Sequence, residues 1–324
     1  MIEGRNVPDG QASPSGNATH DRRIGRVVLS RRTRSDYLYA FAFLTPCLVI
    51  LGVIVFYPLA KVLALSLHNA SLLMAGRQQF VGLENFIELF TRDSVFPIAI
   101  VNTLEFTVFS VAGGFIVGFA LALVLNERIP LRNFFRGVAL IPWVIPGVIV
   151  ALLTLYMFNG EVGIVNYTLH SVGIIRKFIP WFANERAAMW ALIVVNVWNQ
   201  APFYMLMLLA GLQTRPEELV EAAKMDGAGT LIRFWHITLP HLREIIMIIT
   251  ALMVIWNFNN FDLIWTATEG GPVDATMTLS VYTYRQAFLS FRMGYATAIA
   301  VIWLLGLLAF SVFYVRVMEG RRRA

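Results

Sequence analysis

Residues 214–240 read Thr214-Arg-Pro-Glu-Glu-Leu-Val-Glu-Ala-Ala-Lys-Met-Asp-Gly-Ala-Gly-Thr-Leu-Ile-Arg-Phe-Trp-His-Ile-Thr-Leu-Pro240, a polar segment between two strongly apolar runs. Thr214 can cap a first short helix, and Gly227 can close that helix in the left-handed conformation. Thr230 can cap a second short helix, after which Pro240 restarts the chain. The segment therefore predicts two short helices joined by a turn, an arrangement suited to docking on another protein.

The composition of the 324-residue chain is that of a membrane protein. Hydrophobic residues make up 57% and charged residues only 14%, with a mean hydropathy of +0.65, which is too apolar for an average soluble domain. A membrane helix needs about 20 apolar residues. Six runs meet this length, near 38–65, 98–125, 137–158, 187–212, 242–265 and 294–317.

We therefore predict an all-α integral membrane protein with six transmembrane helices in one domain over 36–319. Residues 1–35 are rich in Gly, Ser and Pro with an Arg-rich end, and residues 320–324 are basic. The first segment predicts a disordered cytoplasmic tail whose basic end contacts membrane lipid. With both termini in the cytoplasm, most of the 26 lysines and arginines fall in cytoplasmic segments, as the positive-inside rule requires. Residues 214–240 then lie in the cytoplasm as well.

The sequence argues against several kinds of site. Cys47 is the only cysteine, and the five histidines have no metal-ligand spacing, so we expect no metal site. No lysine lies in a phosphate-binding G-x-x-x-x-G-K-[ST] loop, so this chain would bind no cofactor, and ATP and Mg would belong to partner subunits. A membrane enzyme would need a nucleophile with a base, which we do not find. The positive charges are not gathered in a folded soluble region, so we expect no nucleic-acid partner.

Carboxamide side chains gather in the fourth and fifth predicted spans. Asn196, Asn199 and Gln200 share one face of the fourth helix, and Asn257 and Asn260 share a face of the fifth. Carboxamides within a membrane are costly unless they pair with one another or face water. The two faces predict either a polar central cavity suited to sugar hydroxyls or interhelical hydrogen bonds that only hold the bundle together.

Two prolines distort the third predicted span. Pro142 and Pro146 lie four residues apart, with Trp143 and Gly147 beside them. At membrane depth the freed backbone groups must face protein or a wet cavity, so this segment can line a pathway. The alternative places Trp143 in the interfacial aromatic belt. In the second span a G-x-x-x-G spacing that ends at Gly118 permits close helix packing.

These motifs together resemble the carbohydrate permeases of type I ABC importers, including those of maltose systems. The resemblance is carried by Asn102–Leu104, Ile141–Pro146, Asn257–Phe261, Thr268–Pro272 and the spaced pattern of the EAA loop, which here is residues 214–240. In that family the loop forms a helix that sits in a cleft of a separate ATPase subunit. By resemblance, the ATPase-coupling residues are Glu221, Ala222, Ala223, Asp226, Gly227, Ile237, Leu239 and Pro240.

The resemblance also implies a type I ABC importer permease fold and a function. The implied sugar-contacting residues are Trp143, Gly147, Asn196, Asn199, Gln200, Met253, Asn257 and Asn260. The implied protein is a non-catalytic, multi-pass subunit of the bacterial cytoplasmic (inner) membrane that works by alternating access. Its implied partners are a second homologous permease, two ATPase subunits and an extracytoplasmic sugar-binding protein or lipoprotein. The implied substrate is a disaccharide of the trehalose or maltose class.

The chain departs from the maltose permease in two respects. It lacks that subunit's additional N-terminal spans and its large external domain, and Gly147, Asn199 and Met253 differ in type from the residues of that relative. An ion-coupled secondary transporter of a small polar solute is the alternative function. Such a transporter would need an ion-coupling site, for which Asp262 is the best candidate among few deep ionisable residues.

Overall fold

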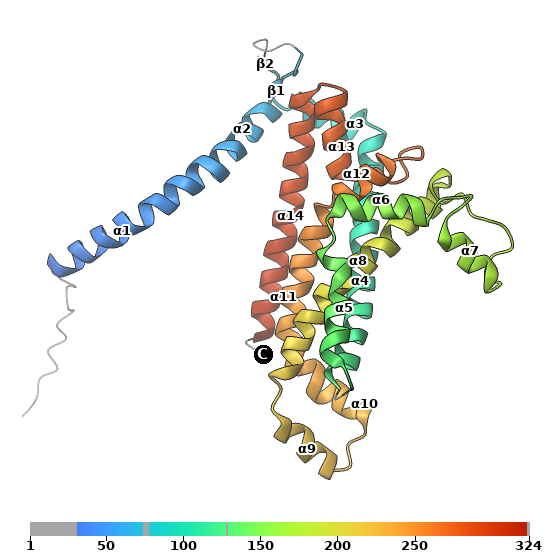
Figure 1. Ribbon diagram of the computed structural model, residues 1–324. Helices are drawn as coiled ribbons and strands as arrows, with labels where there is room; N and C mark the ends of the chain where they lie inside the picture. The colour runs from blue at the N-terminus through green and yellow to red at the C-terminus, as the bar shows by residue number, and fades with distance from the viewer. Residues whose placement is uncertain (1–30, 74–77, 128, 323–324) are drawn as a thin grey trace, which may run out of the picture. The chain divides into compact units, whose positions relative to one another are not determined.

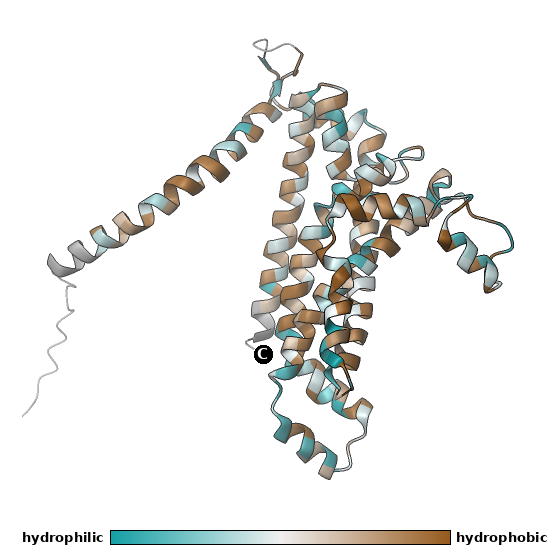
Figure 2. Ribbon diagram, viewed as in Figure 1, coloured by the Kyte–Doolittle hydropathy of each residue, from teal (hydrophilic) through white to brown (hydrophobic). Residues whose placement is uncertain are grey.

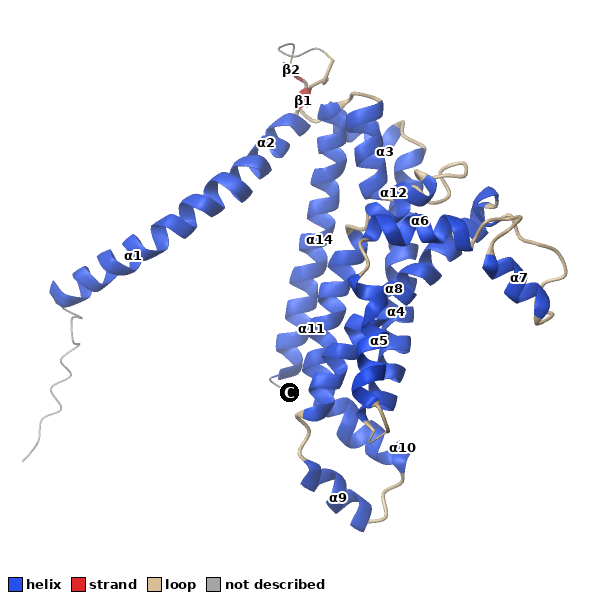
Figure 3. Ribbon diagram, viewed as in Figure 1, coloured by secondary structure: helices blue, strands red, loops and turns tan. Residues whose placement is uncertain are grey.

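The computed structural model describes residues 31–73, 78–127 and 129–322, and these residues are mostly helical (Figures 1 and 3). The chain forms two compact units that divide between Tyr57 and Pro58. The predicted tail falls outside the described residues over 1–30.

The first unit is a helical segment with a π-helical turn. Helix α1 (Arg31–Leu51) continues through η1 (Gly52–Phe56) into α2 (Tyr57–Ser66), which crosses the division between the units. Helix α1 begins inside the predicted disordered tail, because polar residues at a helix end extend a helix that the apolar span has already nucleated. At the other terminus, α14 (Met293–Arg322) likewise extends into the predicted basic tail.

Five described helical segments are long and apolar enough to cross a membrane, and six if one bent pair counts as a single span. The five are Tyr37–Ser66, Val95–Asn126, Glu185–Gln213, Thr230–Thr268 and Met293–Met318. The bent pair corresponds to the third predicted run, and the others match the remaining five runs. Apolar residues dominate these helices, whereas polar residues gather in the EAA loop (Figure 2).

The bent pair consists of α5 (Arg132–Val144) and α6 (Gly147–Met157), which meet at 93°. Pro142 lies within the last turn of α5, and Ile145 takes an extended conformation before Pro146. A residue that precedes proline is driven out of the helical region, and proline offers no N–H. The predicted distortion is therefore a sharp corner between two helices.

In the second unit, α4 (Val95–Asn126), α8 (Glu185–Gln213), α11 (Leu239–Phe258) and α14 run along one bundle (Figure 1). Helices α4 and α8 approach closely at Gly118. A Cβ at this glycine would lie 2.4 Å from Tyr204 Cβ and 2.6 Å from the Ala201 carbonyl oxygen. The predicted glycine spacing thus serves helix packing.

Short elements lie toward the end of the bundle opposite the EAA loop, and α7 (Ile164–Ser171) projects to one side (Figure 1). The other short elements are the antiparallel pair β1 (His68–Asn69) and β2 (Gln79–Phe80), α3 (Glu84–Thr91), η2 (Trp181–Ala183), α12 (Asp262–Thr268), α13 (Leu279–Tyr284) and η4 (Arg285–Leu289). One of the sequence motifs is anchored here, because Asn102 Nδ2 donates to the carbonyl oxygens of Asp274 (2.9 Å) and Met277 (3.1 Å), in the loop that follows the Thr268–Pro272 motif.

Asp93 holds several of these elements together. Its carboxylate accepts hydrogen bonds from the hydroxyls of Tyr282 (2.5 Å) and Tyr295 and from the backbone N–H groups of Val95 and Phe96. Burial alone raises the pKa of the Asp93 carboxyl, but these hydrogen bonds outweigh burial and hold the pKa below its ordinary value. The carboxylate therefore joins the start of α4 to α13 and α14.

The close approach at Gly118 predicts a specific loss of stability. We expect Gly118→Ala to lower the free energy of unfolding by about 1–3 kcal/mol, because the new methyl group would overlap atoms of α8. Gly306→Ala is the matched control, since a Cβ at Gly306 meets no atom within 4 Å. Thermal unfolding of the purified protein in detergent measures both. Equal melting temperatures for the two variants would contradict the packing assigned to Gly118.

Candidate functional site

The EAA loop forms the predicted first helix and turn. Helix α9 (Glu217–Met225) ends at Gly227, whose φ is +79°. The Gly227 N–H donates to the Lys224 carbonyl oxygen (3.0 Å), and the Ala228 N–H donates to that of Ala223 (2.9 Å). This pair of bonds is the glycine closing motif that satisfies carbonyl groups at a helix end. The prediction that Gly227 closes the helix is confirmed.

The two predicted caps are wrong. Thr214 ends α8, and its hydroxyl donates to the Gly211 carbonyl oxygen at 2.9 Å. Pro216 precedes α9 at the cap position, and Gly229 takes that position before α10 (Thr230–Arg233). Helix α8 runs on to the loop itself, so Thr214 satisfies a carbonyl group of the preceding helix and does not serve the following one.

The second predicted helix does not stop before Pro240. Helix α10 continues through the π-helical turn η3 (Phe234–Thr238) into α11, which begins at Leu239. In η3 the hydrogen bonds span five residues, with the Leu239 N–H donating to the Phe234 carbonyl oxygen. We attribute the continuity to this wider turn, which accommodates the proline ring and its missing N–H.

Two polar contacts and a glycine close the base of the loop. Arg215 Nη1 donates to Thr238 Oγ1 at 2.7 Å, and Thr214 Oγ1 lies 3.3 Å from His241 Nε2. A Cβ at Gly211 would lie 2.4 Å from Ile245 Cδ1. The end of α8 and the start of α11 are therefore held in direct contact on either side of α9.

The predicted coupling residues divide by exposure. Five of them are exposed, namely Glu221, Ala222, Asp226, Gly227 and Pro240. The other three, Ala223, Ile237 and Leu239, are half-buried. Apolar side chains are exposed on the same loop, with Met225 88% and Leu231 75% exposed. Apolar groups exposed on a polar segment at the end of a bundle are typical of a protein-docking surface.

Three carboxamides form a closed hydrogen-bonded ring between α8 and α11. Asn196 Nδ2 donates to Asn257 Oδ1 (2.5 Å), Asn257 Nδ2 to Gln200 Oε1 (2.8 Å), and Gln200 Nε2 to Asn196 Oδ1 (3.1 Å). All three side chains are buried. We call these three residues the amide ring. Their carboxamides form the interhelical hydrogen bonds that were one of the two explanations for the carboxamide faces.

Beside the amide ring lies a polar cavity of about 260 Å³. It is lined by Gly147, Val150, Asn196, Asn199, Asn259, Asn260, Phe261, Asp262 and Leu263. Asn260 Nδ2 donates to Asn196 Oδ1 at 3.1 Å, so the cavity wall is attached to the ring. We call this space the amide cavity, and a polar cavity therefore lies beside the interhelical hydrogen bonds.

The corner between α5 and α6 brings the third span to the amide cavity. Gly147, the first residue of α6, lies against Asp262, and a Cβ at Gly147 would lie 3.3 Å from Asp262 Cβ. Asn199 Nδ2 donates to the Pro142 carbonyl oxygen (2.6 Å), one of the carbonyl groups near the corner. The proline segment thus forms one wall and α8 another.

Four of the eight predicted sugar-contacting residues line the amide cavity: Gly147, Asn196, Asn199 and Asn260. Gln200 and Asn257 belong to the amide ring, and Met253 is fully buried in the core of α4, α8 and α11. Trp143 packs on Phe203 with ring centroids 5.5 Å apart and does not line the cavity. The predicted set of sugar-contacting residues omitted Asn259, Phe261 and Asp262, which also line the cavity. Asn259 and Asp262 belong to the polar run at the end of the fifth span, so the sequence does indicate these two.

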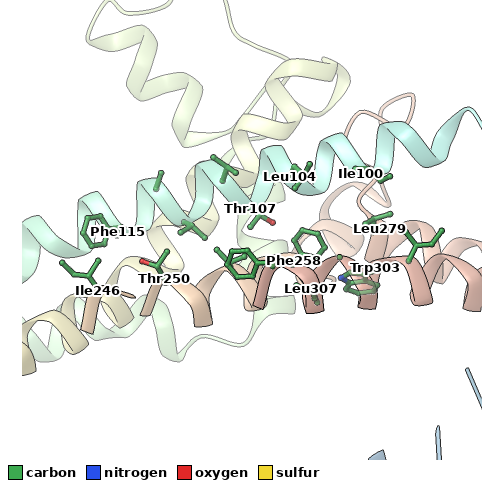
Figure 4. Close-up of a pocket in the computed structure, with 17 residues that line it drawn as sticks. Ile100, Leu104, Thr107, Phe115, Ile246, Thr250, Phe258, Leu279, Trp303 and Leu307 are labelled. Atoms are coloured by element: carbon green, nitrogen blue, oxygen red, sulfur yellow. The ribbon is translucent and has the colours of Figure 1, made fainter. Parts of the chain in front are cut away.

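A second cavity of about 620 Å³ lies between α4, α11 and α14 (Figure 4). Its lining is apolar except for Thr107, Thr250 and Trp303. A polyhydroxylated solute needs more hydrogen-bonding partners than this lining offers. The amide cavity is therefore the better candidate for a sugar site.

Comparisons with known proteins agree on one family. The family described as "Binding-protein-dependent transport system inner membrane component" matches residues 114–323. A sulfoquinovosyl glycerol transport system permease protein of Agrobacterium fabrum is 33% identical over 303 residues, covering 92% of this chain and 97% of the relative. A trehalose/maltose transport system permease protein of Thermococcus litoralis is 32% identical over 302 residues, covering 93% and 99%.

Among solved structures, the fold is similar to that of a chain in a bacterial ABC transporter involved in the import of the acidic polysaccharide alginate. The TM-score is 0.75 at 24% identity, with 89% of this chain and 97% of that chain covered. The same fold occurs in the alginate transporter in complex with a periplasmic protein that holds an alginate pentasaccharide, with a TM-score of 0.74.

The amide ring predicts a strong dependence of stability on Asn257. We expect Asn257→Ala to lower the free energy of unfolding by roughly 1–3 kcal/mol, because Asn196 and Gln200 would each lose a buried partner. Asn259→Ala is the matched control, since Asn259 is exposed and its side chain bonds only to the Ile255 carbonyl oxygen within the described chain. Thermal unfolding in detergent compares them, and an equal loss in both variants would contradict the ring's structural role.

Proposed function

The chain belongs to the family of binding-protein-dependent transport system inner membrane components, and from this premise we propose that it forms half of the pathway by which a disaccharide crosses the bacterial inner membrane. Members of this family are non-catalytic permease subunits of ABC importers, and this chain is one of them. Family membership leaves the ion-coupled alternative without support.

The class of solute is inferred from the relatives and the amide cavity together. The relatives are named for sulfoquinovosyl glycerol and for trehalose or maltose, and the solved neighbour imports alginate. All of these substrates carry sugar units. The observation that carries the proposal is the cavity wall of Asn196, Asn199, Asn259 and Asn260, because carboxamides exchange hydrogen bonds with sugar hydroxyls. We propose a disaccharide of the trehalose or maltose class as the solute.

The size of the amide cavity supports a two-subunit pathway. At about 260 Å³ it lies below the range of roughly 300–1,000 Å³ common for ligand sites. A second homologous permease would supply the opposite wall. An extracytoplasmic binding protein would deliver the sugar to this pair, as the family description implies.

The EAA loop supplies the link to ATP in this proposal. Two partner ATPase subunits would bind ATP and Mg, and their closure would displace α9 through contacts with the exposed face around Glu221. Because α8 and α11 are held together at the base of the loop by Arg215 and Thr238, a displacement of α9 would act on both helices. The same two helices carry the amide ring, so the displacement would reach the cavity wall and open it alternately to either side.

Reconstitution tests the proposed function. The full complex, with second permease, ATPase subunits and binding protein in lipid vesicles, is expected to hydrolyse ATP faster with trehalose or maltose and to accumulate that sugar. Vesicles that lack this chain provide the control. Accumulation of neither sugar, with a binding protein shown to bind it, would contradict the proposed substrate class. ATP hydrolysis that does not respond to sugar would contradict the coupling.

Coupling through α9 predicts a specific effect at Gly227. We expect Gly227→Val to reduce sugar-stimulated ATP hydrolysis several-fold, because a positive φ costs a side chain about 1–2 kcal/mol and the helix end would reorganise. Gly229→Val is the matched control, since Gly229 has a φ of −66° and no atom lies within 4 Å of a Cβ placed there. Equal stimulation in both variants would show that the closing turn of α9 has no part in coupling.

A further inference from the structure

The amide cavity offers free carbonyl oxygens to a ligand. Asn199 Nδ2 donates to the Pro142 carbonyl oxygen (2.6 Å), Asn259 Nδ2 to that of Ile255 (2.7 Å), and Asn260 Nδ2 to Asn196 Oδ1 (3.1 Å). Each of these side chains therefore has one of its two N–H groups engaged within the protein. Within the described residues, no group donates to the Oδ1 atoms of these three asparagines. Their carbonyl oxygens remain available to a ligand.

Asp262 adds a negative charge to the same wall. It is the first residue of α12, its side chain is exposed, and it lines the amide cavity. Its Oδ2 atom would lie 3.5 Å from a Cβ at Gly147, so the absence of a side chain at Gly147 leaves space beside the carboxylate. No described residue donates a hydrogen bond to this carboxylate, and the cavity lining includes no Lys, Arg or His.

This arrangement has a direct chemical consequence for the ligand. An ionised carboxylate only accepts hydrogen bonds, and hydrogen bonds to a charged group are the stronger ones. A ligand that fits must donate, as sugar hydroxyls do. A sugar acid would instead bring a second negative charge against Asp262, and like charges repel each other.

From this geometry we infer that Asp262 contacts the transported sugar and that the amide cavity selects neutral, polyhydroxylated sugars over sugar acids. The inference rests on the proposed function. It goes further than family membership, because known proteins similar to this chain include one named for trehalose and maltose and one that imports an acidic polysaccharide. The Asp262 carboxylate, with no cationic residue in the cavity lining, separates the two classes by charge.

The surroundings of Asp262 permit a substitution that removes only the charge. Phe261 stacks on Trp265 with ring centroids 5.8 Å apart, and Ser280 Oγ donates to the Asn260 carbonyl oxygen at 3.1 Å. These contacts fix the chain on the N-terminal side of Asp262 without its carboxylate. Asp262→Asn keeps the shape of the side chain and exchanges a charged acceptor for a neutral amide.

The test compares Asp262→Asn with wild type in the complete reconstituted complex, with the binding protein saturated with trehalose. We expect trehalose uptake to fall about tenfold or more, which corresponds to the loss of one charge-assisted hydrogen bond. Asp262→Glu retains the charge and is expected to recover part of the uptake. Glu161→Gln, at an exposed carboxylate outside the cavity, is expected to leave uptake unchanged.

Selectivity is read from the uptake ratio of trehalose to the acidic disaccharide digalacturonate, each supplied at a concentration that saturates the binding protein. We expect Asp262→Asn to shift this ratio toward the acid several-fold, and Asp262→Glu to keep the wild-type ratio. Wild-type trehalose uptake and an unchanged ratio in Asp262→Asn would overturn the inference and leave the proposed function intact. A wild-type complex that imports neither trehalose nor maltose would contradict the proposed function itself.

Discussion

Carboxamide groups within a membrane must find hydrogen-bond partners, and this constraint fixes the centre of the molecule. Asn196, Gln200 and Asn257 satisfy it by bonding to one another in a closed ring between α8 and α11. Lipid offers no alternative partner, so separation of these helices would leave several polar groups unpaired. The ring sets the register of the two helices and positions Asn260 and the rest of the amide cavity beside it.

The same pair of helices connects the cavity to the EAA loop. At the far end from the ring, Gly211 allows α8 and α11 to approach closely, and Arg215 bonds to Thr238 across the base of the loop. Helix α9 is therefore attached to both helices at once. One pair of helices thus carries the docking surface at one end and the polar wall deeper in the bundle.

Hydropathy and helical periodicity were sufficient to predict the six apolar runs and the two carboxamide faces, and the preference of glycine for the end of a helix predicted the left-handed closure at Gly227. They could not predict the caps at Thr214 and Thr230, because caps depend on where the preceding helix ends. Periodicity gives the face of a helix but not its depth in the bundle, so Met253 could not be separated from residues that line the cavity. Asp262 joins the site only through the 93° corner, which places Gly147 against it.

We expect the amide cavity to face water and sugar in the working transporter, and the residues behind it to be closed to both. With Cys47, the only cysteine in the sequence, replaced by Ser, Asn199→Cys and Met253→Cys each offer a single thiol to a membrane-impermeant reagent in the reconstituted complex. We expect rapid labelling of Asn199→Cys that trehalose slows, and no labelling of Met253→Cys. Equal labelling at the two positions, or labelling of Asn199→Cys that trehalose leaves unchanged, would contradict this expectation.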